Sequence, residues 1–171
     1  GVGVGPGDPE LLTLKAARIV ENAGVVAHFA KAGRPSNARG IIAHRLRPDV
    51  VGLPLLYPVT VEIEKDNAGY KTAIAAFFDA SAAAVAAHLD AGRDVAVLSE
   101  GDPFFYGSFM HLHSRLQGRV HLEVIPGITG MTGCWNATDT PITWGDDVLT
   151  VLMGTLPEED LVAHMERSDA L

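Results

Sequence analysis

The sequence is poor in cysteine, in positive charge and in long apolar runs. Cys134 is the one cysteine among 171 residues, which excludes an internal disulfide and favours a reducing compartment such as the cytoplasm. We expect its thiol to be buried and inert. The 13 lysines and arginines face 21 aspartates and glutamates, and the net charge of -8 disfavours a nucleic-acid partner. No apolar run reaches the length of a membrane span, and we expect neither a membrane partner nor a signal peptide.

Two common ligand motifs are also missing. The 7 histidines form no zinc-like spacing with the cysteine, so we expect no protein-bound metal. The glycine-rich start, residues 1–9 (GVGVGPGDP), has neither the spacing of a dinucleotide loop nor the lysine of a Walker loop. Pro6 and Pro9 lack the N–H donors that a phosphate needs, and Asp8 adds negative charge. A neutral or cationic ligand fits this loop better, and a plain tight turn before a capped helix is the alternative.

What the sequence does have is a regular alternation of strand-like and helix-like stretches. Its 47% hydrophobic and 20% charged residues are typical of an ordered globular protein. The strand-like runs are residues 1–5, 25–29, 50–53, 94–99, 122–125 and 148–152. The helix-like stretches are residues 9–22, 36–46, 70–91, 104–117, a short one after 127 and one from 156 to the last residue. This alternation predicts an α/β fold with a mainly parallel sheet.

The domain organisation follows from the same pattern. We expect an N-terminal α/β domain over residues 1–120 and the start of a second α/β domain over residues 121–171, which is incomplete. Residues 54–67 contain two prolines and scattered charge, and we expect a loop or an edge hairpin there. Because the first strand-like run begins at Gly1, we also expect residues before it.

Three glycine loops each follow a strand-like run. They are residues 3–9 (GVGPGDP), 100–107 (EGDPFFYG) and 126–130 (PGITG). Asp8 and Asp102 can each cap a following helix, with proline at its first position. The carboxyl ends of parallel strands lie along one edge of a sheet, where open α/β sheets bind small molecules. The three loops therefore predict one shared pocket.

These three loops, in this order and at these separations, resemble the tetrapyrrole methylase family, and the resemblance covers essentially the whole chain. It implies a two-domain α/β enzyme, usually a homodimer, that transfers a methyl group from S-adenosylmethionine held between the domains. The cofactor contacts carried over from the motifs are Pro6, Glu100, Gly101, Asp102, Phe105, Thr129, Gly130 and Met153. Gly130 departs from the family, in which a small residue such as alanine or serine often follows the threonine.

Three further stretches narrow the resemblance to one branch. They are residues 55–60 (LLYPVT), 100–110 (EGDPFFYGSFM) and 147–159 (DVLTVLMGTLPEE). That branch methylates the C20 carbon of precorrin-2 in cobalamin (corrin) biosynthesis, with or without cobalt in the substrate. One alternative is another branch, which methylates a different tetrapyrrole position, ribosomal RNA or a protein histidine derivative. A second alternative is a non-catalytic tetrapyrrole-binding or carrier module. No residue is assigned as a catalytic base.

An acidic protein needs a local basic patch to hold an acidic tetrapyrrole. Residues 28–48 carry several cations and no aspartate or glutamate. These cations are Lys31, Arg34, Arg39, Arg45 and Arg47. Arginine pairs with carboxylates in a two-point geometry, and the turn at 33–36 follows a strand end. The candidate substrate contacts are Arg34, Arg39, Arg45 and Tyr106. A solvated helix face is the alternative explanation of this charge run.

Overall fold

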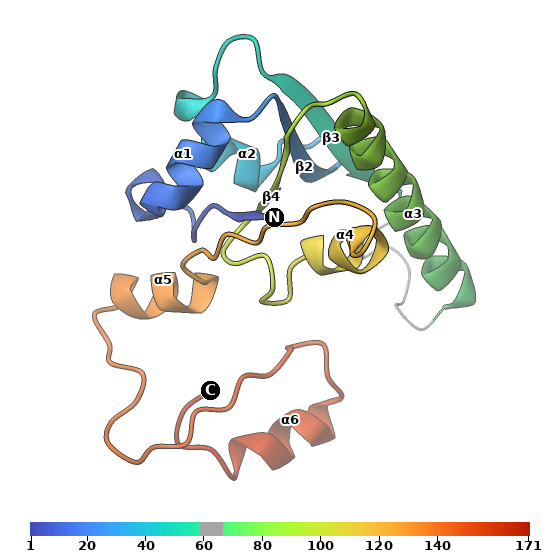
Figure 1. The fold of residues 1–171 in the computed structure, drawn as a ribbon. Helices are drawn as coiled ribbons and strands as arrows, with labels where there is room; N and C mark the ends of the chain where they lie inside the picture. Colours follow the sequence, from blue (N-terminus) through green and yellow to red (C-terminus); the bar gives the residue numbers. More distant parts are fainter. Residues whose placement is uncertain (59–66) are drawn as a thin grey trace. The chain divides into compact units, whose positions relative to one another are not determined.

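The computed structural model describes residues 1–58 and 67–171 (Figure 1). The chain forms two compact units, Gly1–Gly133 and Cys134–Leu171. The expected domain boundary at residue 121 stays a prediction about the longer fold. In the first unit, two clusters of buried side chains form a core on each face of a sheet. Within Cys134–Leu171, by contrast, every residue is half-buried or exposed.

The sheet of the first unit is parallel throughout its four strands. The strands are β1 (Val2–Gly3), β2 (Val25–Lys31), β3 (Val51–Tyr57) and β4 (Val95–Ser99), in the spatial order β1-β4-β2-β3. Gly3 lies opposite Ser99, and Lys31 lies opposite Tyr57, so the strands end along a common edge. Ile125 adds a parallel bridge to Val2. The prediction of an α/β fold with a mainly parallel sheet is confirmed.

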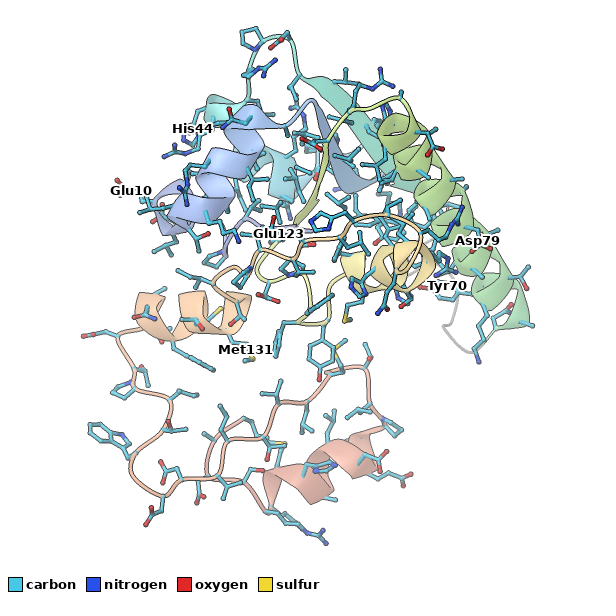
Figure 2. All side chains as sticks on the ribbon, in the orientation of Figure 1. Glu10, His44, Tyr70, Asp79, Glu123 and Met131 are labelled. Carbon is cyan, nitrogen blue, oxygen red and sulfur yellow. The ribbon has the colours of Figure 1, made fainter. Side chains whose placement is uncertain are left out.

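Helices cover both faces of this sheet (Figure 1). Helices α1 (Leu14–Asn22) and α2 (Asn37–Ile41) pack on one face, and α3 (Ala68–Asp90) and α4 (Phe109–Leu116) on the other. Figure 2 shows Glu10 and His44 on the side of α1, and Tyr70 and Asp79 on the side of α3. Side chains alternate across a strand, so Val26 joins the α1 core while its neighbour Ala27 joins the α3 core. Burial on both faces explains the apolar start of β2 and the apolar run of β4, whereas most of the edge strand β3 is exposed.

The predicted helix at residues 9–22 is two elements. Asp8 accepts a hydrogen bond from the Glu10 amide (2.8 Å) and caps the 3₁₀ turn η1 (Pro9–Leu11). Thr13 Oγ1 then accepts from the Ala16 amide (3.1 Å) and starts α1. Both Leu12 and Thr13 have extended backbone angles, because a capping residue lies outside the helix that it caps.

Other element boundaries also differ from the prediction. Helix α4 begins at Phe109 rather than near residue 104, because Tyr106 has a φ of +53° that no helix accommodates. Strand β3 runs through Pro54 to Tyr57, at the start of the stretch where a loop or an edge hairpin was expected. Because β3 is an edge strand, the missing N–H of Pro54 is tolerated. The remainder of the expected loop, residues 59–66, lies outside the described residues.

Two other predicted helices are shorter than expected, and the short helix expected after residue 127 is present. The second predicted helix is α2 followed by a separate 3₁₀ turn, η2 (Ala43–Arg45). Helix α5 (Gly130–Ala137) follows the third loop, and α6 (Glu158–Met165) ends before the last residue. The predicted strand at 148–152 contributes one bridge, between Leu149 and Ala170. Helix α3 has the length and composition to cross a membrane, but its buried residues pack in the sheet core.

Candidate functional site

The three loops meet at the carboxyl edge of the sheet. The first loop continues β1 (residues 4–8), the second continues β4 (residues 100–107), and the third is residues 126–129. The first two are joined by a pair of backbone hydrogen bonds, from the Gly101 amide to Gly5 O (2.8 Å) and from the Gly5 amide to Gly101 O (3.4 Å). The expected convergence of the loops is thus present in the structure.

Glycine is required where the loops cross. A Cβ atom on Gly127 would lie 2.1 Å from Gly101 O, and one on Gly3 would lie 2.5 Å from Gly127 N. Gly101 itself has a φ of +68°, a conformation that side-chain-bearing residues rarely adopt. At Gly130, by contrast, a Cβ would meet no atom within 4 Å. The alanine or serine that is common in the family would therefore fit there.

Asp102 joins the second loop to the third. Its Oδ1 accepts a hydrogen bond from the Phe104 amide (2.8 Å), and its Oδ2 accepts one from the Gly127 amide (3.0 Å). Both carboxylate oxygens are therefore engaged with the backbone. Glu100 differs, because its side chain is exposed and makes no ion pair within the described ranges. Glu100 thus adds to this edge a negative charge that is not paired with a cation in the described ranges.

The third loop leads into α5 through Thr129. Its Oγ1 accepts a hydrogen bond from the Thr132 amide (3.3 Å) and shares another with Thr132 Oγ1 (3.0 Å). A Cβ on Gly101 would lie 3.5 Å from Gly130 N and 3.7 Å from Thr129 Cα. The structure therefore brings Gly101, Thr129 and Gly130 together, although they are far apart in sequence.

The other predicted cofactor contacts fall on two units. Pro6 belongs to the first unit, where a Cβ on Gly133 would lie 2.6 Å from Pro6 Cβ. Phe105 also belongs to it and is 37% exposed, with its ring edge-on to Tyr106 (5.1 Å between centroids). Met153 lies in the second unit and is exposed to a similar degree. The roles of these residues stay predictions.

A cavity of about 400 Å³ lies at the carboxyl ends of β2, β3 and β4. Its lining is mixed in chemistry. The aromatic members are Phe29, Tyr57 and Tyr106, the hydroxyl members besides the two tyrosines are Ser36, Ser99 and Ser108, and the charged members are Lys31 and Glu100. Tyr57 Oη and Ser108 Oγ share a hydrogen bond, and burial raises the pKa of Tyr57.

Of these cavity residues, Glu100 and Tyr106 were predicted as ligand contacts, and Lys31 was named only as part of the basic run. Tyr57 lies in the stretch 55–60 that carried the family resemblance, and its position at a strand end was the signal that could have identified it. Tyr106 is 53% exposed and holds its left-handed φ of +53° at the rim. Such a conformation costs a non-glycine residue about 1–3 kcal/mol and persists where surrounding structure enforces it.

The predicted arginine contacts are dispersed. Arg34 and Arg39 are exposed on the loop after β2 and on α2. Arg45 instead forms an ion pair with Glu21 of α1 (2.7 Å), and Arg47 pairs with Asp49 (2.9 Å from Nε to Oδ1). The described lining of the cavity includes no arginine. The substrate contacts predicted for Arg34, Arg39 and Arg45 stay predictions.

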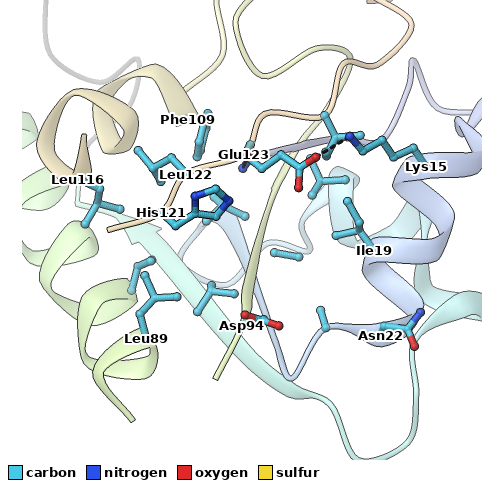
Figure 3. A pocket seen from close by; sticks show the side chains of 18 of the residues that line it. Lys15, Ile19, Asn22, Leu89, Asp94, Phe109, Leu116, His121, Leu122 and Glu123 are labelled. Carbon is cyan, nitrogen blue, oxygen red and sulfur yellow. Dashed lines mark hydrogen bonds and ion pairs between the residues drawn. The ribbon is translucent and has the colours of Figure 1, made fainter. Parts of the chain in front are cut away.

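A second cavity, of about 570 Å³, lies at the opposite, amino edge of the sheet (Figure 3). Ile19, Leu89 and Leu116 give it an apolar lining, and Lys15 and Glu123 form an ion pair across one side (2.5 Å). Among the described residues, none of the predicted site residues lines this cavity. It is larger than the first cavity, but it lies away from the three loops.

Two expectations concern metal and cysteine. Within residues 1–58 and 67–171, no group of three or more histidine, cysteine or acidic side chains is placed to hold a metal ion. The expectation of a buried thiol is wrong, because Cys134 is exposed. Its helix α5 has no buried residue, so the thiol lacks the packing that would cover it.

Comparisons with known proteins show which sequences this chain resembles. A chain from Sinorhizobium sp., named precorrin-2 C(20)-methyltransferase, is 59% identical over 99% of this chain and 69% of its own length. Cobalamin biosynthesis protein CobIJ of Mycobacterium tuberculosis is 47% identical over 99% of this chain, which covers 34% of that longer protein.

Solved structures that resemble this chain include two tetrapyrrole methyltransferases. A cobalt precorrin-4 methyltransferase, CbiF, superposes with a TM-score of 0.67 at 25% identity, covering 95% of this chain and 63% of its own. A uroporphyrin-III C-methyltransferase from Thermus thermophilus, complexed with S-adenosylhomocysteine, has a TM-score of 0.53 at 26% identity. It covers 92% of this chain and 57% of its own. The chain thus spans about two thirds or less of these structures.

A family profile described as Tetrapyrrole (Corrin/Porphyrin) Methylases matches residues 1–171. This match extends over the three converging loops and both compact units. It confirms the resemblance that the loop motifs indicate. The chain belongs to the tetrapyrrole methylase family.

Proposed function

We propose that this chain belongs to an S-adenosylmethionine-dependent methyltransferase that methylates C20 of precorrin-2 in cobalamin biosynthesis. The observation that carries the proposal is the 59% identity, over 99% of the chain, to a precorrin-2 C(20)-methyltransferase. The match to the family profile along the full chain supports it. Because the chain spans 69% of that relative, the activity is proposed for the longer protein.

The carboxyl edge fits the methyl donor. The loop crossing is built from backbone, so a ligand can approach the main chain closely at Gly101 and Gly130. Glu100 supplies an unpaired carboxylate beside this crossing, which suits a cationic ligand. When bound, S-adenosylmethionine supplies a methyl group on a positively charged sulfur. In the first unit, the proposed contacts are Pro6, Glu100, Gly101, Asp102, Phe105, Thr129 and Gly130. Met153 is the contact proposed in the second unit.

The contribution of the protein is alignment rather than covalent catalysis. Loops fixed by the Gly5–Gly101 and Asp102–Gly127 hydrogen bonds hold their backbone groups in place before a ligand arrives. Such fixed positioning lowers the entropy cost of bringing a methyl group and an electron-rich carbon together. The neighbouring cavity, with Tyr106 at its rim, would hold part of the tetrapyrrole and exclude water. Arg34 and Arg39 remain candidate partners for its carboxylates.

The surroundings of the reaction are also proposals. We place the enzyme in the cytoplasm as a homodimer, on the basis of the family resemblance and the single cysteine. Its partner is the acidic tetrapyrrole, while the net charge of -8 disfavours nucleic acid. We assign no resident metal, and any cobalt would arrive with the substrate.

The test is a methyl-transfer assay with the full-length protein. Precorrin-2 and S-adenosylmethionine with a labelled methyl group are incubated without oxygen, and the labelled carbon is located by NMR. Label at C20 is the expected result. Label at another carbon would assign the protein to a different branch of the family. Tight binding of precorrin-2 without transfer, in protein shown to bind S-adenosylhomocysteine, would favour the carrier module instead.

A further inference from the structure

We propose that the carboxyl-edge cavity binds a carboxylate arm of the tetrapyrrole through the hydroxyls of Tyr57, Ser108 and Ser99. The inference rests on the proposed function, since it names residues that would hold that substrate. It differs from the sequence expectation, which assigned the carboxylates to arginines. All three hydroxyl residues line the cavity, and two of them come from strand ends, where parallel sheets bind ligands.

A count of protons supports a donor role for the first two hydroxyls. Tyr57 and Ser108 each carry one O–H group, and their mutual hydrogen bond uses one of the two protons. The other proton has no acceptor among the described residues. Buried or half-buried hydroxyls normally find a partner, so this remaining proton is available to an acceptor in the cavity. A carboxylate oxygen is the strongest such acceptor that the substrate carries.

Ser99 provides a second, independent observation. It is 6% exposed, it lines the same cavity, and its Oγ has no hydrogen-bond partner in the part of the chain that the structure describes. A buried hydroxyl without a partner destabilises the folded protein. A rotation about its Cα–Cβ bond would let the hydroxyl donate to a bound carboxylate. The hydrogen bond to the substrate would then offset the destabilisation that the partnerless hydroxyl causes in the free protein.

The cavity also has the size and charge for one arm of the substrate. Its volume of about 400 Å³ lies in the range of small-molecule sites but suits a side chain and its pyrrole better than a complete macrocycle. Lys31 at the end of β2 adds a positive charge to the lining. The ring of Phe29 stacks on Tyr57 at 5.8 Å and fixes the direction of its hydroxyl.

The test compares substrate binding with cofactor binding in the full-length protein. Precorrin-2 is titrated without oxygen into the wild type, Tyr57→Phe, Ser108→Ala and Ser99→Ala, and S-adenosylhomocysteine is titrated by calorimetry. We expect each variant to raise the dissociation constant and the KM for precorrin-2 about tenfold, equal to about 1.4 kcal/mol. We expect kcat and S-adenosylhomocysteine affinity to stay within about twofold of the wild type.

Ser114→Ala is the matched control, because Ser114 lies on α4, the helix that Ser108 directly precedes, and its hydroxyl bonds to Met110 O outside the cavity. The double variant Tyr57→Phe/Ser108→Ala should bind precorrin-2 more weakly than either single variant, because each single variant keeps one hydroxyl proton, no longer held by its partner, and the double variant keeps none. Ser99→Ala should keep or raise the melting temperature while weakening substrate binding. A merely structural serine would not show that combination.

The chemical class of the ligand group is tested with esterified substrate. Fully esterified precorrin-2 should bind the wild type and the variants equally, because its arms no longer carry the charge that strengthens the hydrogen bond. If all three variants bound precorrin-2 as tightly as the wild type does, the inference would be overturned and the proposed function would remain intact. An equal loss for acid and ester would overturn the assignment to a carboxylate. Failure of the wild-type protein to bind precorrin-2 would instead count against the proposed function.

Discussion

The two edges of one parallel sheet carry cavities of different chemistry. At the carboxyl edge, three loops cross with their backbones in contact, and hydroxyls, aromatic rings and two opposite charges line the cavity. At the amino edge, the lining of a larger cavity combines aliphatic side chains with an exposed ion pair and with polar residues such as Asn22, Asp94 and His121. Size therefore does not identify the site. The difference arises because every strand of a parallel sheet releases its following loop at the carboxyl edge, where capped and glycine-containing turns gather.

The comparison predicts that the carboxyl edge tolerates much less added volume. In Gly127→Ala, the new methyl group would overlap Gly101 O, and we expect a loss of about 3 kcal/mol in the free energy of unfolding. Gly24→Ala at the amino edge is the control, because its Cβ would lie 3.7 Å from Asp94 O, an ordinary contact. Urea unfolding measures the loss in the free energy of unfolding for both variants. Equal losses in the two variants would remove the distinction between the edges.

The next largest effect is expected at the acid that joins the loops. Asp102→Asn keeps one acceptor oxygen, so it can serve the Phe104 amide or the Gly127 amide but not both. We expect a loss of about 1.5 kcal/mol in stability and about a tenfold weaker affinity of the full-length protein for S-adenosylhomocysteine. Asp94→Asn at the amino edge should change neither quantity. Unchanged cofactor affinity in Asp102→Asn would show that the loops need no such bond.

His28, in the middle of β2, and Glu123 at the amino edge should respond to acid in different pH ranges. Burial, and then the nearby Arg39 guanidinium, lowers the pKa of His28 from 6.5. The unfolded chain therefore takes up a proton before the folded one does, and stability falls as the pH drops below about 6.5. At the amino edge, Lys15 lowers the pKa of Glu123 from 4.5, so that contribution is lost only at lower pH.

Melting temperatures measured from about pH 3 to about pH 8 separate the contribution of His28 from that of Glu123. His28→Gln should flatten the curve near pH 6, about where histidine titrates, and Glu123→Gln should flatten it only below about pH 4.5. Identical curves for the wild type and His28→Gln would show that the burial of this imidazole has no consequence for stability.

The smallest effect is expected at the amino-edge ion pair. Lys15 and Glu123 lie 2.5 Å apart, but their side chains are 54% and 55% exposed. Exposed pairs gain little because water and salt screen them. Lys15→Ala should leave the urea midpoint and the affinities for S-adenosylhomocysteine and precorrin-2 unchanged. A marked loss of either affinity would show that the amino edge participates in function.

The sequence predicted the fold class because continuous apolar runs separated by helical stretches leave few other solutions. It was less accurate at element boundaries. The helix expected at residues 9–22 is interrupted at Thr13, and the helix expected from residue 104 begins at Phe109. In both places, a cap or a left-handed residue competes with the helical pattern over one turn. Hydrophobic spacing alone does not report such a local interruption.

The candidate site was predictable in its loops but not in its cavity. The Gly-Asp-Pro motifs mark tight turns by themselves, because the constraints on glycine and proline are local. The arginine run suggested a substrate patch, yet Arg45 is paired with Glu21 from another helix. Tyr57, Ser99 and Ser108 were not singled out, because an isolated tyrosine or serine in a sequence resembles many structural ones.

The sequence by itself determined the family, the parallel α/β class and the position of the three glycine loops, since each depends on residues that are neighbours in the chain. The tertiary structure decided how those loops are used. Asp102 bonds to Gly127 across 25 positions, and Tyr57 bonds to Ser108 across 51. Such pairs depend on strand order, which places β4 between β1 and β2. Local rules act within a few residues, whereas the site is made where distant segments meet.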